Sequence, residues 1–125
     1  MLYAFREESG LGVETALKIA CGLGAGMGRK EEVCGAVTGG ILVIGSKYGR
    51  GENDDRTATE NTYAKTRELM ERFSEEHGTF ICRQLLTGLD LTAQGGQKLF
   101  KENELLTKTC KPCVETVVEI LEGMV

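Results

Sequence analysis

The sequence predicts an all-α fold, a single compact domain over residues 1–125 built from about five to seven helices. Three observations predict it. Apolar residues recur at helical spacing, capping residues and glycines delimit the resulting segments, and no linker, repeat or low-complexity tract interrupts the chain. A chain of 125 residues can bury a core of its own, so its five cysteines are not required for stability.

The first expected elements are short. Residues 2–8 are expected to be the end of a helix that stops before Gly10. From Val13 to Ala20, apolar residues fall at positions i, i+3, i+4 and i+7, which predicts a helix with one buried face. That face is expected to consist of Val13, Ala16, Leu17 and Ala20. Alternating glycines in Gly22–Gly28 remove side chains and permit positive φ, so they end this helix.

The run from Glu32 to Gly45 is apolar on all sides, and we expect a helix there, although its second half could also form a strand. Small residues recur at four-residue spacing: the pairs are Gly35 with Gly39 and Ala36 with Gly40. This spacing favours a helix that a neighbouring helix approaches closely. Glycine inside a helix costs about 1 kcal/mol relative to alanine, so close packing or a bound group is expected near this backbone. Gly35 and Gly39 are therefore candidate cofactor-binding positions.

The longest predicted helix follows the polar turn 49–55, with Asp54 or Asp55 as its N-cap, and ends near His77 before Gly78. Shorter helices are expected at residues 81–86 and 93–100. Residues 112–124 form the last predicted helix. Its first residue, a proline, suits the first turn because its missing N–H would have no partner there.

Charge and hydropathy exclude two classes of partner. The chain has 15 basic and 19 acidic residues, a net charge of -4, and lacks the positive footprint that nucleic-acid binding needs. No apolar segment approaches the roughly 20 residues that span a bilayer, and Arg6–Glu8 interrupt any secretory signal. We therefore expect a cytoplasmic protein without membrane insertion. In a reducing compartment the five cysteines are more typical of thiols, metal ligands or redox groups than of disulfides.

The glycines do not form a nucleotide-binding motif. A Gly-x-Gly-x-x-Gly pattern fails because its third glycine is replaced by Met27 or Arg29, depending on the starting point. A phosphate-binding loop fails because Ser46 precedes Lys47, the reverse of the required order. The single histidine cannot complete a Cys2His2 zinc site or specify a Ser-His-Asp triad.

Cysteine placement carries the functional signal. Cys34, Cys82 and Cys110 each lie near a predicted helix N-terminus, where unpaired N–H groups and the helix dipole lower the pKa of a thiol. Packing alone does not require that position, so these three are the candidate catalytic residues. Cys113 forms a Cys-x-x-Cys pair with Cys110, a spacing that favours metal ligation or thiol–disulfide exchange. Cys21, at the end of a helix, is more typical of packing.

Taken together, these motifs resemble a family of redox-active proteins named for the pattern C-GCAxxG-C-C. The matching segments are Gly24–Arg29, Cys34–Gly39 (as CGAxxG), Lys47–Arg50, Phe80–Leu86 with the third cysteine, and Cys110–Glu115 with the fourth. The similarity covers nearly the whole chain. It implies an all-helical, cysteine-based redox or cofactor-binding domain. The sequence is also similar to the cysteine domain of split-Soret cytochromes, which implies an iron–sulfur cluster.

The family pattern implies a first cysteine a few residues ahead of the segment Leu2–Phe5, where this sequence has none. Either the sequence starts late or this cysteine is absent. If it is absent, a four-thiolate cluster would take Cys113 or Cys21 as its fourth ligand, both outside the family pattern.

Three functions follow as hypotheses. The first is a redox or electron-transfer protein that binds an iron–sulfur cluster, with Cys34, Cys82, Cys110 and Cys113 as the metal ligands. The second is metal-free thiol–disulfide chemistry, in which Cys34 or Cys110 is a low-pKa thiolate resolved by another cysteine. Both need a redox partner. The third is a non-catalytic helical scaffold that forms a homodimer through the small-residue helix.

Overall fold

The computed structural model describes all of residues 1–125, and its regular structure is helical. Seven right-handed α-helices are connected by turns, and the only β-type pairing is an isolated bridge between Val33 and Ile81. The predicted all-α fold class and the expected number of helices are confirmed. None of the helices combines the length and the apolar character needed to cross a membrane.

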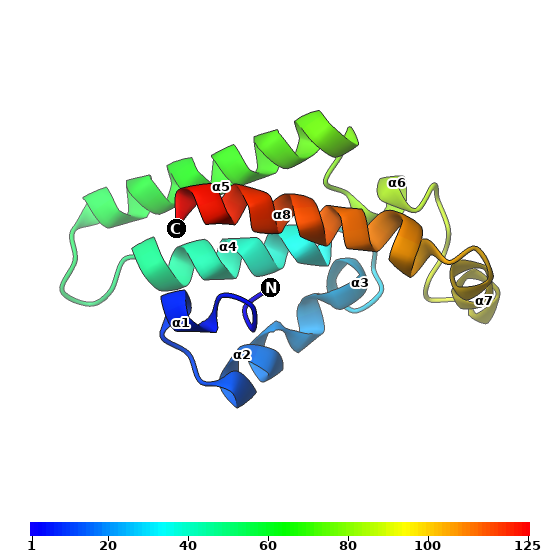
Figure 1. Ribbon diagram of the computed structural model, residues 1–125, viewed down its shortest axis with the longest axis horizontal. Coiled ribbons are helices and arrows are strands. Elements are labelled where there is room, and N and C mark those ends of the chain that lie inside the picture. The colour runs from blue at the N-terminus through cyan, green and yellow to red at the C-terminus, as the bar shows by residue number, and fades with distance from the viewer.

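Three long helices form the body of the protein (Figure 1): α4 (Gly35–Tyr48), α5 (Arg56–His77) and α8 (Lys111–Met124). Helices α4 and α8 run in the same direction, and α5 runs opposite to both. At the C-terminal end of the parallel pair, the Tyr48 hydroxyl donates a hydrogen bond of 2.7 Å to the Met124 carbonyl. The N-termini of α4 and α8 therefore lie together at the other end.

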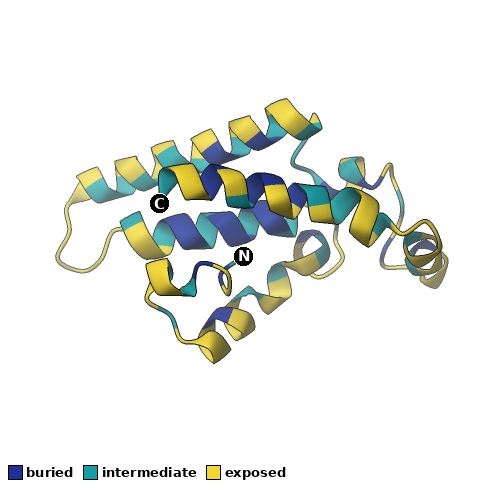
Figure 2. Ribbon diagram, viewed as in Figure 1, coloured by how far each residue is buried: buried dark blue, intermediate teal, exposed yellow.

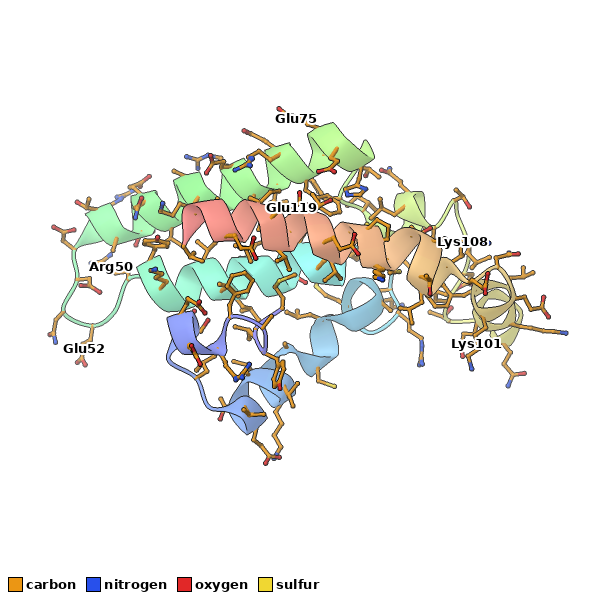
Figure 3. The ribbon with its side chains drawn as sticks, in the orientation of Figure 1. Arg50, Glu52, Glu75, Lys101, Lys108 and Glu119 are labelled. Carbon is orange, nitrogen blue, oxygen red and sulfur yellow. The ribbon has the colours of Figure 1, made fainter.

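The buried faces of these helices meet in one apolar core (Figure 2). Its most deeply buried members on the three helices are Val37, Val43, Ile44, Leu69, Phe73, Cys113, Val117 and Leu121. Charged side chains point outward, as Glu75 on α5 and Glu119 on α8 illustrate (Figure 3). Helix α4 contacts both α5 and α8 as well as the N-terminal segment. This central position explains why its sequence is apolar on all sides.

The close approach that we expected at the small-residue helix occurs, and the segments that approach it belong to the same chain. A Cβ atom at Gly40 would lie 2.9 Å from Leu69 Cδ2 and 2.9 Å from Val117 Cγ1, closer than carbon atoms can pack. A Cβ atom at Gly39 would lie 2.8 Å from the Met1 Cβ atom. The small-residue face of α4 is thus filled by the chain's own helices and its N-terminal residue.

The ends of α5 and the start of α8 follow the expected capping signals. The Asp55 carboxylate accepts a hydrogen bond of 2.9 Å from the Thr57 N–H, which caps α5. Gly78 ends the helix with a φ of 82°. Pro112 lies in the first turn of α8. Helix α4 begins later than the predicted residue 32, because residues 33 and 34 pair with the backbone of residues 80 and 81.

The N-terminal helices are α1 (Arg6–Ser9) and α2 (Val13–Ala20). Helix α1 starts later than predicted because residues 2–5 form a turn, whereas α2 has the predicted bounds. The predicted burial of α2 is wrong: Val13 and Leu17 are 48% and 55% exposed, and only Ala16 is buried. Helix α2 mainly contacts the short 3-10 turn that follows it and lies at the edge of the molecule (Figure 1). Its apolar face therefore has little to pack against.

Short helical segments form the end of the molecule near α7 in Figure 1: α6 (Cys82–Leu85), α7 (Gln94–Glu102) and a π-helical turn (Leu106–Cys110). The π-helical turn was not predicted, and it leads directly into α8. A second, smaller core forms here from Cys82, Leu86 and Leu91. This end of the molecule contains the candidate site.

Packing at Gly40 can be tested by substitution. We expect Gly40→Val to lower the free energy of unfolding by about 2 kcal/mol, because the new methyl groups would overlap Leu69 and Val117. Urea denaturation followed by circular dichroism measures this change. Gly45→Ala is the matched control on the same helix, since a Cβ atom there meets nothing within 4 Å and helix propensity rises. Equal stability of the two variants would contradict the packing argument.

Candidate functional site

Three cysteines from three different elements line one cavity of about 440 Å³. Cys34 immediately precedes α4, Cys82 begins α6, and Cys110 ends the π-helical turn. The walls of the cavity are mostly apolar. Its large apolar members are Leu86, Leu91, Phe100, Leu106 and Val114. The structure thus brings the three predicted catalytic cysteines to a single site.

Cys34 is held by backbone contacts at the N-terminus of α4. Its N–H donates a hydrogen bond of 2.8 Å to the Phe80 carbonyl, and its own carbonyl accepts one of 2.9 Å from the Val37 N–H. The neighbouring Gly35 also lines the cavity, and a Cβ atom there would lie 3.0 Å from the Leu23 carbonyl oxygen. A larger residue at position 35 would therefore displace the backbone at Leu23.

The thiol of Cys34 is unusually acidic. A hydrogen bond from the Cys113 thiol is the largest cause, and the N–H groups of Ala36 and Val37 add to it. Burial acts in the opposite direction, and together these effects lower the pKa of Cys34 to about 6. Cys34 is therefore mainly a thiolate at neutral pH.

Cys113 lies behind Cys34, in the first turn of α8. Its residue is only 1% exposed, it belongs to the main core, and it is not among the residues that line the cavity. The hydrogen bond to Cys34, burial and the charges of the nearby thiols raise the pKa of Cys113. It therefore remains a protonated donor while Cys34 is a thiolate.

The other two cavity cysteines are also held as neutral thiols. Burial, followed by the charges of Cys34 and Glu31, raises the pKa of Cys82 to about 12. Burial and the charge of Cys34 raise the pKa of Cys110. The site thus has one thiolate among four thiol groups. Cys21 is exposed on the 3-10 turn and does not line the cavity, and neither does Gly39.

One wall of the cavity is a left-handed turn that begins within α3 (Gly24–Met27). Five consecutive residues have positive φ: Ala25 (54°), Gly26 (68°), Met27 (69°), Gly28 (63°) and Arg29 (65°). Only a glycine fits at position 26, because a Cβ atom there would lie 2.5 Å from the Glu31 Cα. Left-handed conformations cost non-glycine residues about 1–2 kcal/mol each. The predicted positive φ is therefore found, but it extends beyond the glycines.

Backbone hydrogen bonds hold this turn in place. The Gly28 N–H donates to the Gly22 carbonyl at 3.1 Å, and the Glu31 N–H donates to the Ala25 carbonyl at 3.2 Å. The Glu32 N–H closes the turn with a bond of 3.0 Å to the Gly26 carbonyl. These bonds compensate for the unfavourable backbone conformation and fix the turn against the start of α4.

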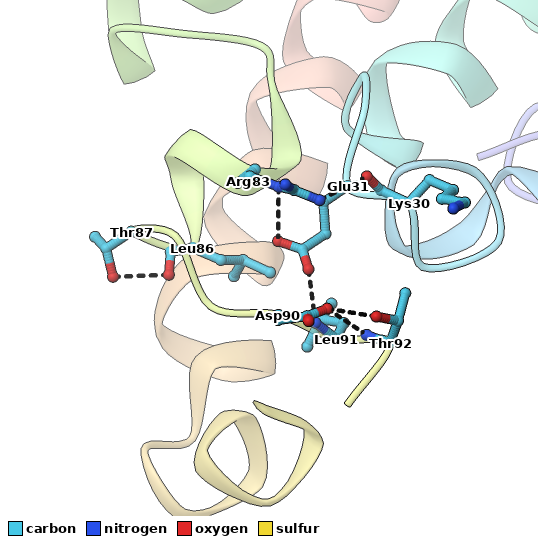
Figure 4. Close-up of polar contacts among 8 residues, drawn as sticks. All are labelled: Lys30, Glu31, Arg83, Leu86, Thr87, Asp90, Leu91 and Thr92. Carbon is cyan, nitrogen blue, oxygen red and sulfur yellow. Dashed lines mark hydrogen bonds and ion pairs between the residues drawn. The ribbon is translucent and has the colours of Figure 1, made fainter. Parts of the chain in front are cut away.

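Glu31 connects this turn to the opposite side of the cavity (Figure 4). Its side chain is fully buried, and one carboxylate oxygen accepts a hydrogen bond of 2.6 Å from the Leu91 N–H. The other oxygen has no hydrogen-bond partner and lies 3.9 Å from Arg83 Nε. The backbone of residues 31 and 32 also accepts hydrogen bonds from the N–H groups of Arg83 and Cys82. Glu31 therefore positions the loop that carries Leu91, and the backbone of Glu31 and Glu32 together positions the start of α6, where Cys82 lies.

Sequence reasoning missed Glu31. It stands in the charged segment Arg29–Glu32, which is typical of a solvated surface, and no local pattern marks its burial. Its only signal is indirect. A glycine-rich turn just before it, with no nucleotide motif, indicates a chain reversal that brings the next residues against another part of the molecule.

The cysteine side chains are suitable ligands for a thiolate-bound metal group, but the distances between them are too long for one. No three His, Cys, Asp or Glu side chains lie close enough together to hold a metal ion. Cys34, Cys82 and Cys110 nevertheless share one cavity, with Cys113 directly behind Cys34. Thiolates are the usual ligands of iron–sulfur clusters. These four residues could hold such a cluster if the side chains move together.

The role of Glu31 can be tested separately from redox chemistry. We expect Glu31→Ala to lower the free energy of unfolding by about 1–3 kcal/mol, because the Leu91 N–H loses its buried acceptor. Hydrogen exchange at the Leu91 amide should become faster by a larger factor than exchange in α5. Glu32→Ala is the matched control, since its side chain is exposed. An unchanged Leu91 exchange rate would show that the carboxylate does not hold the loop.

Comparison with known proteins gives one match. The model of the family C_GCAxxG_C_C, described as "Putative redox-active protein", matches residues 1–124. No curated protein and no solved structure matches the chain. The match covers all four cysteines at the site as well as the glycine-rich turn and Glu31. The chain therefore belongs to the C_GCAxxG_C_C family of redox-active proteins.

Proposed function

We propose that the protein performs thiol–disulfide exchange, with Cys34 as the attacking thiolate and Cys113 as the resolving thiol. The observation that carries this proposal is the contact between Cys34 and Cys113, because the Cys113 thiol is the largest cause of the lowered pKa of Cys34, which is about 6. Thiol–disulfide exchange needs a thiolate, and the best attacking thiol has a pKa near ambient pH. Cys34 meets that requirement and lines a cavity that a substrate can enter.

The reaction balances with a disulfide as the oxidant. The Cys34 thiolate attacks one sulfur of R–S–S–R′, forms a mixed disulfide and releases R′–S⁻. The released thiolate takes the proton of Cys113. The resulting Cys113 thiolate attacks Cys34 Sγ, forms the Cys34–Cys113 disulfide and expels R–S⁻. Two electrons pass to the substrate, and an external dithiol would return the protein to its reduced form.

Several features favour the reduced form of the site. Two N–H groups at the start of α4 stabilise the Cys34 thiolate, as does the Cys113 thiol. Stabilisation of the reduced form makes the disulfide of the same pair a stronger oxidant. Free thiols persist in reducing compartments, so we propose that the protein works in the cytoplasm.

A second candidate function is electron transfer through an iron–sulfur cluster. It is favoured by the convergence of Cys34, Cys82 and Cys110 on one cavity, with Cys113 as the fourth thiol. Such a cluster would supply one-electron chemistry and would require all four thiols to be deprotonated. The mostly apolar walls would limit the access of water to it.

The low pKa of Cys34 predicts how its alkylation rate depends on pH. Alkylation of Cys34 by iodoacetamide should become faster as the pH rises through about 6 and then level off, because the thiolate is the reacting species. Cys113→Ala removes the largest cause of the lowered pKa, so the midpoint should move up toward the usual thiol range. At pH 7 the reaction should then slow by about 10-fold. Mass spectrometry of the Cys34 peptide gives the rate.

Cys21→Ala is the matched control for this measurement, since Cys21 is exposed and outside the cavity. It should leave the Cys34 profile unchanged. If the profile of Cys113→Ala keeps its midpoint near pH 6, the hydrogen bond from Cys113 does not set the acidity of Cys34.

One preparation can separate the two candidate functions. Protein purified anaerobically is analysed for iron and sulfide and then equilibrated with glutathione redox buffers, alkylated and mapped. Thiol–disulfide exchange predicts a reversible Cys34–Cys113 disulfide, with the loss of two hydrogen atoms. A cluster predicts bound iron and sulfide. Cys82→Ser distinguishes the two, because it removes a cluster ligand and leaves the Cys34–Cys113 pair intact.

Each outcome has a direct reading. A disulfide that persists in Cys82→Ser supports exchange through Cys34 and Cys113. Iron and sulfide that are bound by the wild type and lost in Cys82→Ser support the cluster. A Cys34 thiol that stays reduced across the whole buffer range contradicts the exchange proposal, and a preparation free of iron and sulfide contradicts the cluster.

A further inference from the structure

We propose that the cysteine cavity binds a small organic anion with an apolar body, whose anionic group lies between Arg29 and Lys101. This inference rests on the proposed function in one respect, since the bound molecule would be the redox partner of Cys34. It adds the chemical class of that molecule. The argument comes from the size of the cavity, its lining and the placement of its charges.

The size and lining of the cavity fit a small molecule. Its volume of about 440 Å³ lies within the range of about 300–1,000 Å³ that ligand pockets occupy. Large apolar side chains from α7, α8, the π-helical turn and the segment after α6 form most of its wall. The cavity has one amide side chain, that of Gln97, and its N–H group donates to the Leu91 carbonyl at 2.9 Å. Such a lining favours a ligand with an apolar body, because burying apolar surface is favourable.

The charges that line the cavity all have one sign. Arg29 and Lys101 are its only ionisable lining residues apart from the cysteines, and no aspartate or glutamate lines it. Neither cation takes part in any of the ion pairs of the chain. The protein as a whole carries a net charge of -4. Two cationic side chains without ion-pair partners, at one cavity of an acidic protein, therefore indicate an anionic ligand.

The position of the two cations also predicts the orientation of the ligand. Both residues line the cavity and are also exposed to solvent, and Figure 3 shows Lys101 on α7 at the end of the molecule. Cys34, Cys82 and Cys110 line the cavity together with its large apolar side chains. The anionic group should therefore point outward and the apolar body inward, against the thiols.

Arg29 has a position that the backbone determines. It ends the left-handed turn with a φ of 65°, a conformation that residues other than glycine rarely adopt. The hydrogen bonds that hold this turn thus also fix where the Arg29 side chain leaves the main chain. Lys101 comes from the last turn of α7, on a different element. Two independent elements contribute one cation each to the same cavity.

Two fluorescent probes with the same aromatic body test the proposal. 8-Anilinonaphthalene-1-sulfonate carries one sulfonate, and N-phenyl-1-naphthylamine is neutral. Both should bind to the wild-type protein with enhanced fluorescence. Arg29→Gln and Lys101→Gln should each weaken sulfonate binding by about 2- to 5-fold, as expected for exposed ion pairs, and leave binding of the neutral probe unchanged.

Two further variants locate the binding site. Lys98→Gln is the matched charge control, because Lys98 lies on the same helix, pairs with Glu102 and does not line the cavity. It should leave both affinities unchanged. Val114→Trp places a large side chain at a half-exposed position of the cavity wall, and both probes should then be lost while the helical circular dichroism remains.

The proposal is overturned if the wild type binds neither probe, if Val114→Trp still binds both, or if Lys98→Gln weakens sulfonate binding as much as Lys101→Gln does. Cys34→Ser separates this inference from the proposed function, since it should abolish thiol–disulfide exchange and retain both probes. Probe binding without any exchange activity in the wild type would refute the proposed function alone. Exchange activity without probe binding would refute the anion site alone.

Discussion

Close packing of α4 against α5 and α8 is the constraint on which the rest of the structure depends. Gly40 has no side chain, so Leu69 and Val117 can approach the α4 backbone from two sides. Because α4 and α8 run in the same direction, this approach also brings their N-termini together. Cys34 thereby meets Cys113, and its acidity follows from that contact. A feature of the core thus determines the protonation state of a residue at its edge.

Local patterns predicted the helices that have both capping signals and a covered apolar face. Helix α5 is the clearest case, since Asp55 and Gly78 mark its ends and Leu69 and Phe73 are buried. Helix α2 shows the limit of such reasoning. Its spacing correctly predicts a helix with an apolar side, but spacing contains no information on whether another element covers that side.

The sequence predicted which cysteines form the candidate site. It predicted only some of the contacts that hold them there. Positions at helix N-termini marked Cys34 and Cys82 because local backbone chemistry acts there. The burial of Glu31 and the contact between Cys34 and Cys113 depend on chain segments distant in sequence. Left-handed Ala25 and Met27 oppose the backbone preferences of their residue types, so propensity predicts the opposite of what is found.

In the left-handed turn, the usual effect of a glycine substitution on stability is reversed. Elsewhere, replacing alanine by glycine adds flexibility and weakens the fold. At Ala25 the backbone is left-handed, so glycine would relieve a steric penalty of about 1–2 kcal/mol, which exceeds the entropic cost of about 0.5–1 kcal/mol that glycine adds. A glycine-rich sequence is commonly taken as a hinge. Here Gly26 belongs to a cavity wall, and the shape of that wall depends on a left-handed backbone that side chains disfavour.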